Sequence, residues 1–167
     1  MKSTSTLRLT GLIFLLLTSV AFAQEWRTEN PSAMDLNYRQ EQIERLNGIA
    51  RLELGRSLSG QRDNDIALLQ QMLDQRLVNS SDVSLLQAMG IDLGEVLKRE
   101  KGLEWIIYID KLGRSRALNV PGTDEFIFPV TQISRRAEVG IKVDVRAVYQ
   151  QMVDAVDAIR NQPPSLR

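Results

Sequence analysis

The sequence predicts a single α+β domain in which helices come first, a small antiparallel sheet built on a hairpin follows, and helices close the chain. Three observations support this. Apolar residues recur at helical spacing up to about residue 100, β-formers dominate Leu103–Ile109, and helical spacing returns after Asp144. With 167 residues, 43% hydrophobic and 25% charged, the composition is that of a globular protein.

Apolar stripes separated by charged residues predict the first helices. Asp35 can cap a helix that runs from Leu36 to Leu54, and the Gly- and Ser-rich segment 55–60 indicates a linker. Two further helices are expected at 63–77 and 82–100. A glycine directly after the third helix provides its stop signal.

A change of period predicts the sheet. Leu103–Ile109 is a nearly all-apolar strand, and Arg114–Val120 returns as its partner after a tight turn. A short third strand is expected at 126–128, followed by a small helix over 129–137. The last helix begins after Asp144, which can cap it.

The chain divides into five expected segments. These are a signal peptide at 1–23, a flexible N-terminal arm at 24–34, an N-terminal helix with its linker at 35–60, an α+β core domain at 61–160 and a C-terminal tail at 161–167.

The first residues have the three parts of a secretory signal peptide. Lys2 and Arg8 supply a basic start, Leu9–Val20 supplies a short apolar core, and an Ala-Phe-Ala end follows. A transmembrane span requires about 20 apolar residues, more than this run provides. We therefore expect cleavage between Ala23 and Gln24, and a periplasmic or secreted location.

Cysteine and histidine are both absent. The sequence therefore excludes disulfides, a thiolate nucleophile, a His-assisted serine and zinc sites built on Cys or His. We expect no cofactor and no metal, and we assign no catalytic residue. Without the two basic residues of the leader, acidic side chains outnumber basic ones by two (21 against 19). Nucleic acid is therefore not an expected partner, and no stable membrane anchor is expected after cleavage.

Carboxylates are the remaining acid–base groups near neutral pH. The run Asp63-Asn64-Asp65 lacks the glycine of a calcium loop and is explained by helix capping. A glycosidase needs two carboxyl groups on either side of a bound sugar. Glu95, Glu100 and Glu104 could supply them, although their spacing is not diagnostic.

Four arginines are the candidate binding residues. Arg114 and Arg116 lie two apart on a strand and share one face, and Arg135 and Arg136 lie near the end of the short helix. Paired guanidinium groups can bind a carboxylate or phosphate in a bidentate manner. The alternative is that all four are solvated and form ordinary ion pairs with nearby acids.

Two further pairs of residues carry structural expectations. Gly90 and Gly94 lie inside the third helix, where each costs about 1 kcal/mol relative to Ala. We expect another segment to pack closely there, in preference to a ligand resting on a glycine groove. Trp105 and Tyr108 face opposite sides of their strand, with Trp105 in the core.

From about residue 68 to residue 159 the chain resembles a bacterial family, the Domain of Unknown Function thirty-eight-zero-six. The residues that carry the resemblance are Gly90-Ile91-Asp92-Leu93-Gly94-Glu95, Gly102-Leu103-Glu104-Trp105, Gly113, Phe128-Pro129 and Ile133-Ser134-Arg135-Arg136-Ala137-Glu138 with Gly140 after it. The basic pair is Arg-Arg here, where Lys-Arg is associated with the family. The resemblance implies a small bacterial domain and no activity, cofactor or catalytic set.

Together these features favour an exported, non-catalytic binding or interaction module with a protein partner in the cell envelope, such as an inhibitor or immunity-type protein. One alternative is a cell-envelope hydrolase that uses carboxylates, which requires two acidic groups facing each other across a cleft. Another is a structural helper that pairs with a second chain through its N-terminal helix. The partner and the oligomeric state stay open.

Overall fold

The computed structural model describes residues 26–162, which form five helices and a four-stranded antiparallel sheet. The predicted α+β architecture is confirmed. The helices are α1 (Ala33–Leu54), α2 (Arg62–Asp74), α3 (Val83–Lys101), α4 (Ser134–Glu138) and α5 (Val145–Arg160). The strands are β1 (Arg27–Glu29), β2 (Glu104–Asp110), β3 (Gly113–Asn119) and β4 (Phe126–Ile127). The expected signal peptide with its Ala23–Gln24 bond lies outside the described residues, as do the last five residues.

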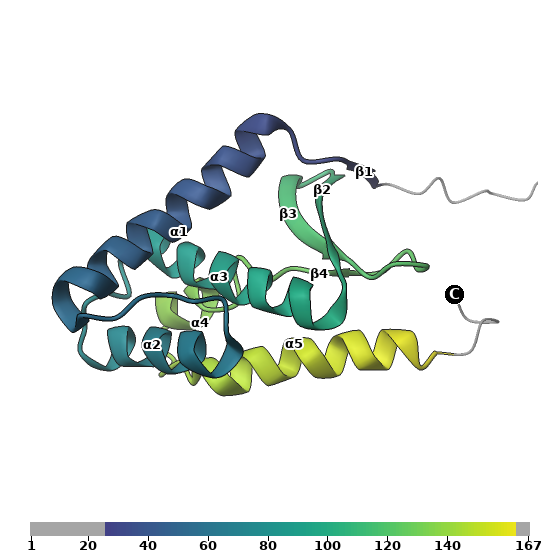
Figure 1. The fold of residues 1–167 in the computed structure, drawn as a ribbon. Helices are drawn as coiled ribbons and strands as arrows, with labels where there is room; N and C mark the ends of the chain where they lie inside the picture. Colours follow the sequence, from purple (N-terminus) through teal and green to yellow (C-terminus); the bar gives the residue numbers. More distant parts are fainter. Residues whose placement is uncertain (1–25, 163–167) are drawn as a thin grey trace, which may run out of the picture.

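Helix α3 is the central element and contacts α1, α2, α4 and α5 (Figure 1). The Asp82 side chain caps it by accepting a hydrogen bond from the Leu85 amide, and Gly102 ends it in the left-handed conformation. Every residue from Ala88 to Gly94 is buried. A helix covered on all sides is apolar all round, and within this stretch Asp92 is the exception.

Close packing explains the two glycines of α3, as predicted. A Cβ on Gly90 would lie 2.4 Å from the Val130 carbonyl oxygen and 2.5 Å from that of Pro129. A Cβ on Gly94 would lie 2.6 Å from the Trp105 ring. The segment after β4 therefore crosses α3 at a distance that only glycine permits. Helix α4 begins at Ser134, later than the predicted Pro129, because residues 130–133 form turns.

Helix α1 packs along α3 and buries Leu46 and Ala50 in the common core. It begins earlier than predicted because Ser32, and not Asp35, is its N-cap. The Ser32 hydroxyl accepts a hydrogen bond from the Asp35 amide, and the Asp35 carboxylate accepts one from the Ser32 amide. This reciprocal pair is a capping box, which satisfies two backbone donors at the start of the helix.

The sheet has the order β1-β2-β3-β4, and all its neighbours are antiparallel. Trp105 lies opposite Leu118 and, as predicted, is a core residue, with only 6% of its surface exposed. The arm was expected to be flexible, but residues 27–29 form β1 and place Thr28 opposite Tyr108. The prediction was wrong because a strand of three residues is too short to show the alternation of apolar and polar residues by which a strand is recognised.

Four aromatic side chains gather on the other face of the sheet. Trp26 stacks on Tyr108 with 5.7 Å between ring centroids. Phe126 contacts Trp26 edge-on at 5.0 Å and Tyr108 in a tilted arrangement at 5.2 Å. Phe128 meets Tyr108 at 5.3 Å. All four are half-buried, so they cover each other more than they contribute to the central core.

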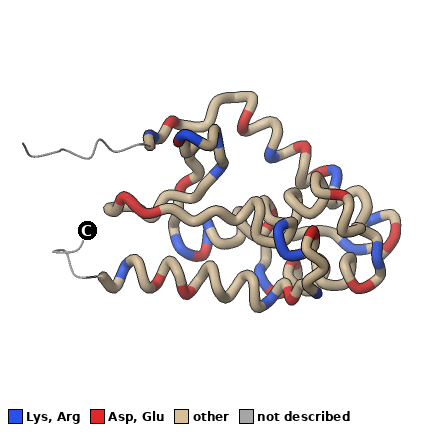
Figure 2. Tube along the Cα trace, turned by 180° about the vertical axis from the view of Figure 1, so that it is seen from behind, with Lys and Arg blue, Asp and Glu red and all other residues tan. Residues whose placement is uncertain are grey.

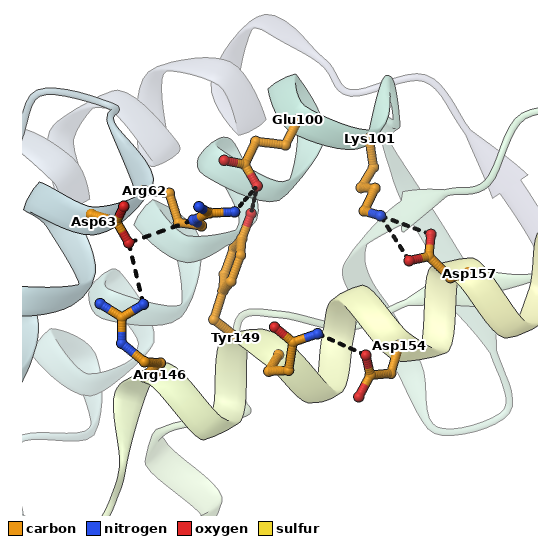
Figure 3. A network of polar contacts seen from close by, with 9 residues as sticks. Arg62, Asp63, Glu100, Lys101, Arg146, Tyr149, Asp154 and Asp157 are labelled. Atoms are coloured by element: carbon orange, nitrogen blue, oxygen red, sulfur yellow. Dashed lines mark hydrogen bonds and ion pairs between the residues drawn. The ribbon is translucent and has the colours of Figure 1, made fainter.

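Polar contacts tie α5 to α2 and α3 (Figure 3). Tyr149 donates to Glu100 at 2.7 Å, and Lys101 forms an ion pair with Asp157 at 2.7 Å. Burial, reinforced by the bond to Glu100, raises the pKa of the Tyr149 hydroxyl. Within residues 26–162 no helix combines the length and the apolar character that a membrane crossing needs.

Candidate functional site

A cleft of about 350 Å³ lies between α1, α3 and the linker from α1 to α2. The aliphatic side chains of Leu36, Ile43 and Leu58 form part of its wall. Its charged side chains are Arg39 from α1 and Asp92, Glu95 and Arg99 from α3. The lining is mainly polar, and a cleft of this size with convergent polar groups is a candidate small-ligand site.

Asp92 is the unusual residue of this cleft. Its side chain belongs to the buried stretch of α3, and only 4% of the residue is exposed. Its Oδ2 atom is buried and has no hydrogen-bond partner among the described residues. Burial raises the pKa of Asp92 to about 8, and the charge of Asp65 acts in the same direction, while Arg99 opposes the shift. A carboxyl group with such a pKa changes its charge near physiological pH, a common property of functional sites.

Asp65 of α2 is the second buried carboxyl group of this region and is 0% exposed. Its Oδ1 atom accepts hydrogen bonds from the Ser59 amide and from Asn64 Nδ2, both at 2.8 Å. Its Oδ2 atom has no partner within the described part of the chain. Because Ser59 lines the cleft, Asp65 fixes the linker at the edge of the cleft. Two neighbouring buried carboxyl groups thus each keep one unsatisfied oxygen, which is rare in folded proteins.

The other charged side chains of the cleft make contacts that tie its walls together. Arg39 forms an ion pair with Glu95 at 2.8 Å, and Trp105 donates to the same Glu95 oxygen at 2.9 Å. The Arg39 guanidinium also lies over the Trp105 ring, 4.9 Å from its centroid. Arg99 donates to the Gly60 carbonyl. These contacts hold α1, α3, β2 and the linker in place, and no ion pair within the described residues involves Asp92.

The predicted binding residues Arg114 and Arg116 lie on β3. Their side chains reach the first turn of α1. Arg116 donates to Asp35 at 3.1 Å, and its guanidinium lies over the Tyr38 ring, 4.1 Å from the centroid. Arg114 is 3.7 Å from the same carboxylate. Hydrogen bonds from Ser32 hold the pKa of Asp35 below its usual value despite burial, and the two arginines add to this effect. Both arginines therefore anchor the sheet to α1 through one carboxylate.

The second predicted pair, Arg135 and Arg136, lies on α4. Arg136 donates to the Gln132 side chain at 2.9 Å and to Gln151 of α5 at 2.8 Å, whereas Arg135 is exposed. Within the described residues no hydrogen bond or ion pair joins this pair to β3. Basic and acidic positions are also interspersed along the described part of the trace (Figure 2).

Two larger hollows, of about 630 and 590 Å³, lie around Lys142 and Val143 between α2 and the start of α5. Their lining includes none of the buried polar atoms that lack a partner in the described residues. In the same part of the chain, no group of three or more acidic side chains is arranged to hold a metal ion. The cleft at Asp92 is therefore the better candidate for a ligand.

Sequence reasoning did not select Asp92 or Asp65 as site residues. Asp65 was assigned to helix capping, and Asp92 stood inside a motif without a role of its own. The available signal was an acidic residue between Ile91 and Leu93. It lies between Gly90 and Gly94, which already indicated that another segment packs closely against this helix. In the structure this helix is covered on every side over residues 88–94, so the carboxyl group at position 92 is buried.

These features define a small α+β domain with a polar cleft beside its central helix. The family model called Domain of unknown function (DUF3806) matches residues 65–149, about half of the chain. The chain belongs to this family, which confirms the resemblance found in its sequence. No curated protein matches the sequence.

One solved structure shares the fold. It is a crystal structure of a protein from Bacteroides thetaiotaomicron VPI-5482 at 1.50 Å resolution, with a TM-score of 0.70 and 21% sequence identity. The similarity covers 78% of this chain and 48% of that one, so this chain spans about half the length of the other protein.

Proposed function

We propose that the protein is an exported, non-catalytic binding module whose ligand enters the cleft between α1 and α3. The observation that carries this proposal is the buried Asp92 carboxyl group, which lines the cleft and keeps an oxygen without a partner in the described residues. An unsatisfied buried oxygen costs about 1–3 kcal/mol. A bound ligand that donates to this carboxyl group would recover that energy. The signal-peptide pattern of residues 1–23 supports export.

Native mass spectrometry tests the proposal. The mature chain is incubated with a small-molecule extract of the bacterial envelope, and we expect a discrete added mass. Leu58→Trp fills the cleft from the linker and should abolish the adduct. Leu52→Trp is the matched control, because Leu52 is 82% exposed and does not line the cleft. No adduct, or equal adducts with both variants, would contradict the proposal.

A carboxylate-dependent hydrolase is the second candidate. Asp92 and Glu95 both line the cleft and lie one helical turn apart, and burial raises the pKa of Asp92 into the range of a general acid. The contacts of Glu95 with Arg39 and Trp105 argue against it as a mobile base. Release of reducing ends from cell-wall glycan by the wild type, lost in Asp92→Asn, would establish the hydrolase instead.

The third candidate, a structural helper, is supported by exposed apolar side chains on α1. Met34 is 80% exposed and Leu52 is 82% exposed. Deletion of residues 24–60 would also remove Leu46 and Ala50, which belong to the core, so point substitutions are the better test. The double variant Met34→Ser and Leu52→Ser keeps the core. If the protein forms oligomers that this variant loses in light scattering, then the helper role is supported.

A further inference from the structure

Two residues that line the cleft each keep a polar atom without a hydrogen-bond partner, and the two atoms are of opposite kind. Arg39 Nε is a buried donor and Asp92 Oδ2 is a buried oxygen, and neither has a partner among the described residues. The two side chains belong to the same part of the cleft, because Arg39 pairs at 2.8 Å with Glu95, one helical turn along α3 from Asp92. Buried polar groups are nearly always hydrogen-bonded. A ligand that supplies one acceptor and one donor would therefore complete the cleft.

We propose that the cleft binds a small uncharged amide, whose carbonyl oxygen accepts a hydrogen bond from Arg39 and whose N–H group donates one to Asp92. This inference rests on the proposed binding function and names its ligand class. An amide carries an acceptor and a donor side by side, whereas a carboxylate only accepts and an ammonium group only donates. The lining is mainly polar, with Leu36, Ile43 and Leu58 as its aliphatic side chains, and this suits a polar group on a short aliphatic body.

The protonation of Asp92 favours an uncharged ligand. Burial raises the pKa of Asp92 to about 8, Asp65 on α2 and Glu95 on α3 act in the same direction, and Arg99 on α3 opposes them. Arg39 of α1 lines the same cleft. At neutral pH the carboxyl group therefore donates through its O–H and accepts through its C=O, so that it can form two hydrogen bonds with one amide. The hydroxyl group of an alcohol has its single donor and its acceptor on one atom and cannot pair in this way.

Loss of the Asp92 proton should weaken the amide. The carboxylate can no longer donate, and its charge becomes more costly once a ligand excludes water from the cleft. Affinity should therefore be nearly constant between pH 5 and pH 7 and fall about tenfold between pH 7 and pH 9, as Asp92 ionises.

The test uses four probes with the same five-carbon body, pentanamide, pentanoate, pentylamine and 1-pentanol, in NMR titrations that follow the backbone N–H signals. We expect pentanamide to shift signals of α3 and of the linker 55–60, and the other three probes to bind at least tenfold more weakly. Asp92→Asn should bind pentanamide as tightly as the wild type and without dependence on pH, because an Asn side chain donates and accepts but does not ionise. Asp92→Leu removes both functions and should weaken pentanamide at least tenfold. Asp124→Asn, an exposed control in the turn before β4, should keep both the affinity and the pH dependence of the wild type.

Several outcomes overturn the inference. These are equal or tighter binding of pentanoate, pentylamine or pentanol, no shift by pentanamide, an affinity of the wild type that does not fall by pH 9, weakened binding by Asp92→Asn, or full binding by Asp92→Leu. Because Asp92→Leu could act through the fold, Leu58→Trp is a second variant that should also abolish the shifts. A native mass adduct that contains no amide group would overturn this inference alone, whereas the absence of any adduct would overturn the proposed function.

Discussion

The close crossing at Gly90 gives the sharpest prediction about the fold. Replacing Gly90 with Ala adds a Cβ at 2.4 Å from the Val130 carbonyl oxygen and 2.5 Å from that of Pro129. Both obstacles are backbone atoms, so the crossing segment must move as a unit by about 1 Å to reach ordinary contact distance. Overpacking of this kind costs about 1–3 kcal/mol, and the upper end applies because neither obstacle can rotate away.

The gain in helix propensity offsets part of this cost. Alanine is favoured over glycine inside a helix by about 1 kcal/mol, so we expect Gly90→Ala to lower the free energy of unfolding by about 2 kcal/mol. Gly48→Ala in α1 is the matched control, because a Cβ there meets nothing within 4 Å. That variant should be stabilised by about 0.5–1 kcal/mol.

Urea unfolding followed by circular dichroism measures both variants, with equal slopes as the check that both unfold in the same way. A difference of about 3 kcal/mol between the two alanine variants is the expected result. If Gly90→Ala is as stable as the wild type, then the crossing segment does not approach α3 as closely as described, and the explanation of both glycines fails.

Three other predictions concern proton binding, α5 and export. Because burial raises the pKa of Asp92 to about 8, the folded protein keeps a proton that the unfolded chain loses above about pH 4. The free energy of unfolding therefore falls as pH rises from about 4 to about 8. Asp92→Asn lacks this proton, so its free energy of unfolding should rise relative to that of the wild type by up to about 1.4 kcal/mol per pH unit between pH 5 and 7. Urea unfolding at each pH measures the difference. Tyr149→Phe removes the 2.7 Å bond to Glu100 and should cost about 2 kcal/mol, whereas Tyr38→Phe, which keeps the ring face under its arginine, should cost under about 0.5 kcal/mol in the same assay. Sequencing of the protein from an envelope fraction should begin at Gln24, and an intact leader would contradict export.

The sequence predicted the fold because its signals were local and strong. The helical stripes and the β-rich Leu103–Ile109 run fixed the order of elements, and the glycines of α3 correctly indicated close cover. Boundaries were less accurate where a cap was misassigned, as at Ser32. Strand β1 escaped prediction because its stability comes from pairing with β2, about 80 residues later, and not from its own period.

The candidate site was harder to predict because burial, and not residue type, makes it. Arg114 and Arg116 were chosen for their charge, yet Asp35 and the Tyr38 ring occupy Arg116 in the structure. Conversely, Asp92 is one of 21 acidic residues, and only the packing of three helices and the linker distinguishes it. A single sequence shows which residues can ionise, whereas the fold decides which of them lose their water.

The outermost strands of the sheet are also its shortest. β1 has three residues and β4 has two, while the seven-residue strands β2 and β3 lie between them. A long edge strand can pair with strands of other molecules, and short edge strands limit this kind of aggregation. β1 begins only a few residues after the expected cleavage bond. Removal of residues 27–29 would therefore uncover the backbone of β2, and we expect it to promote edge-to-edge aggregation.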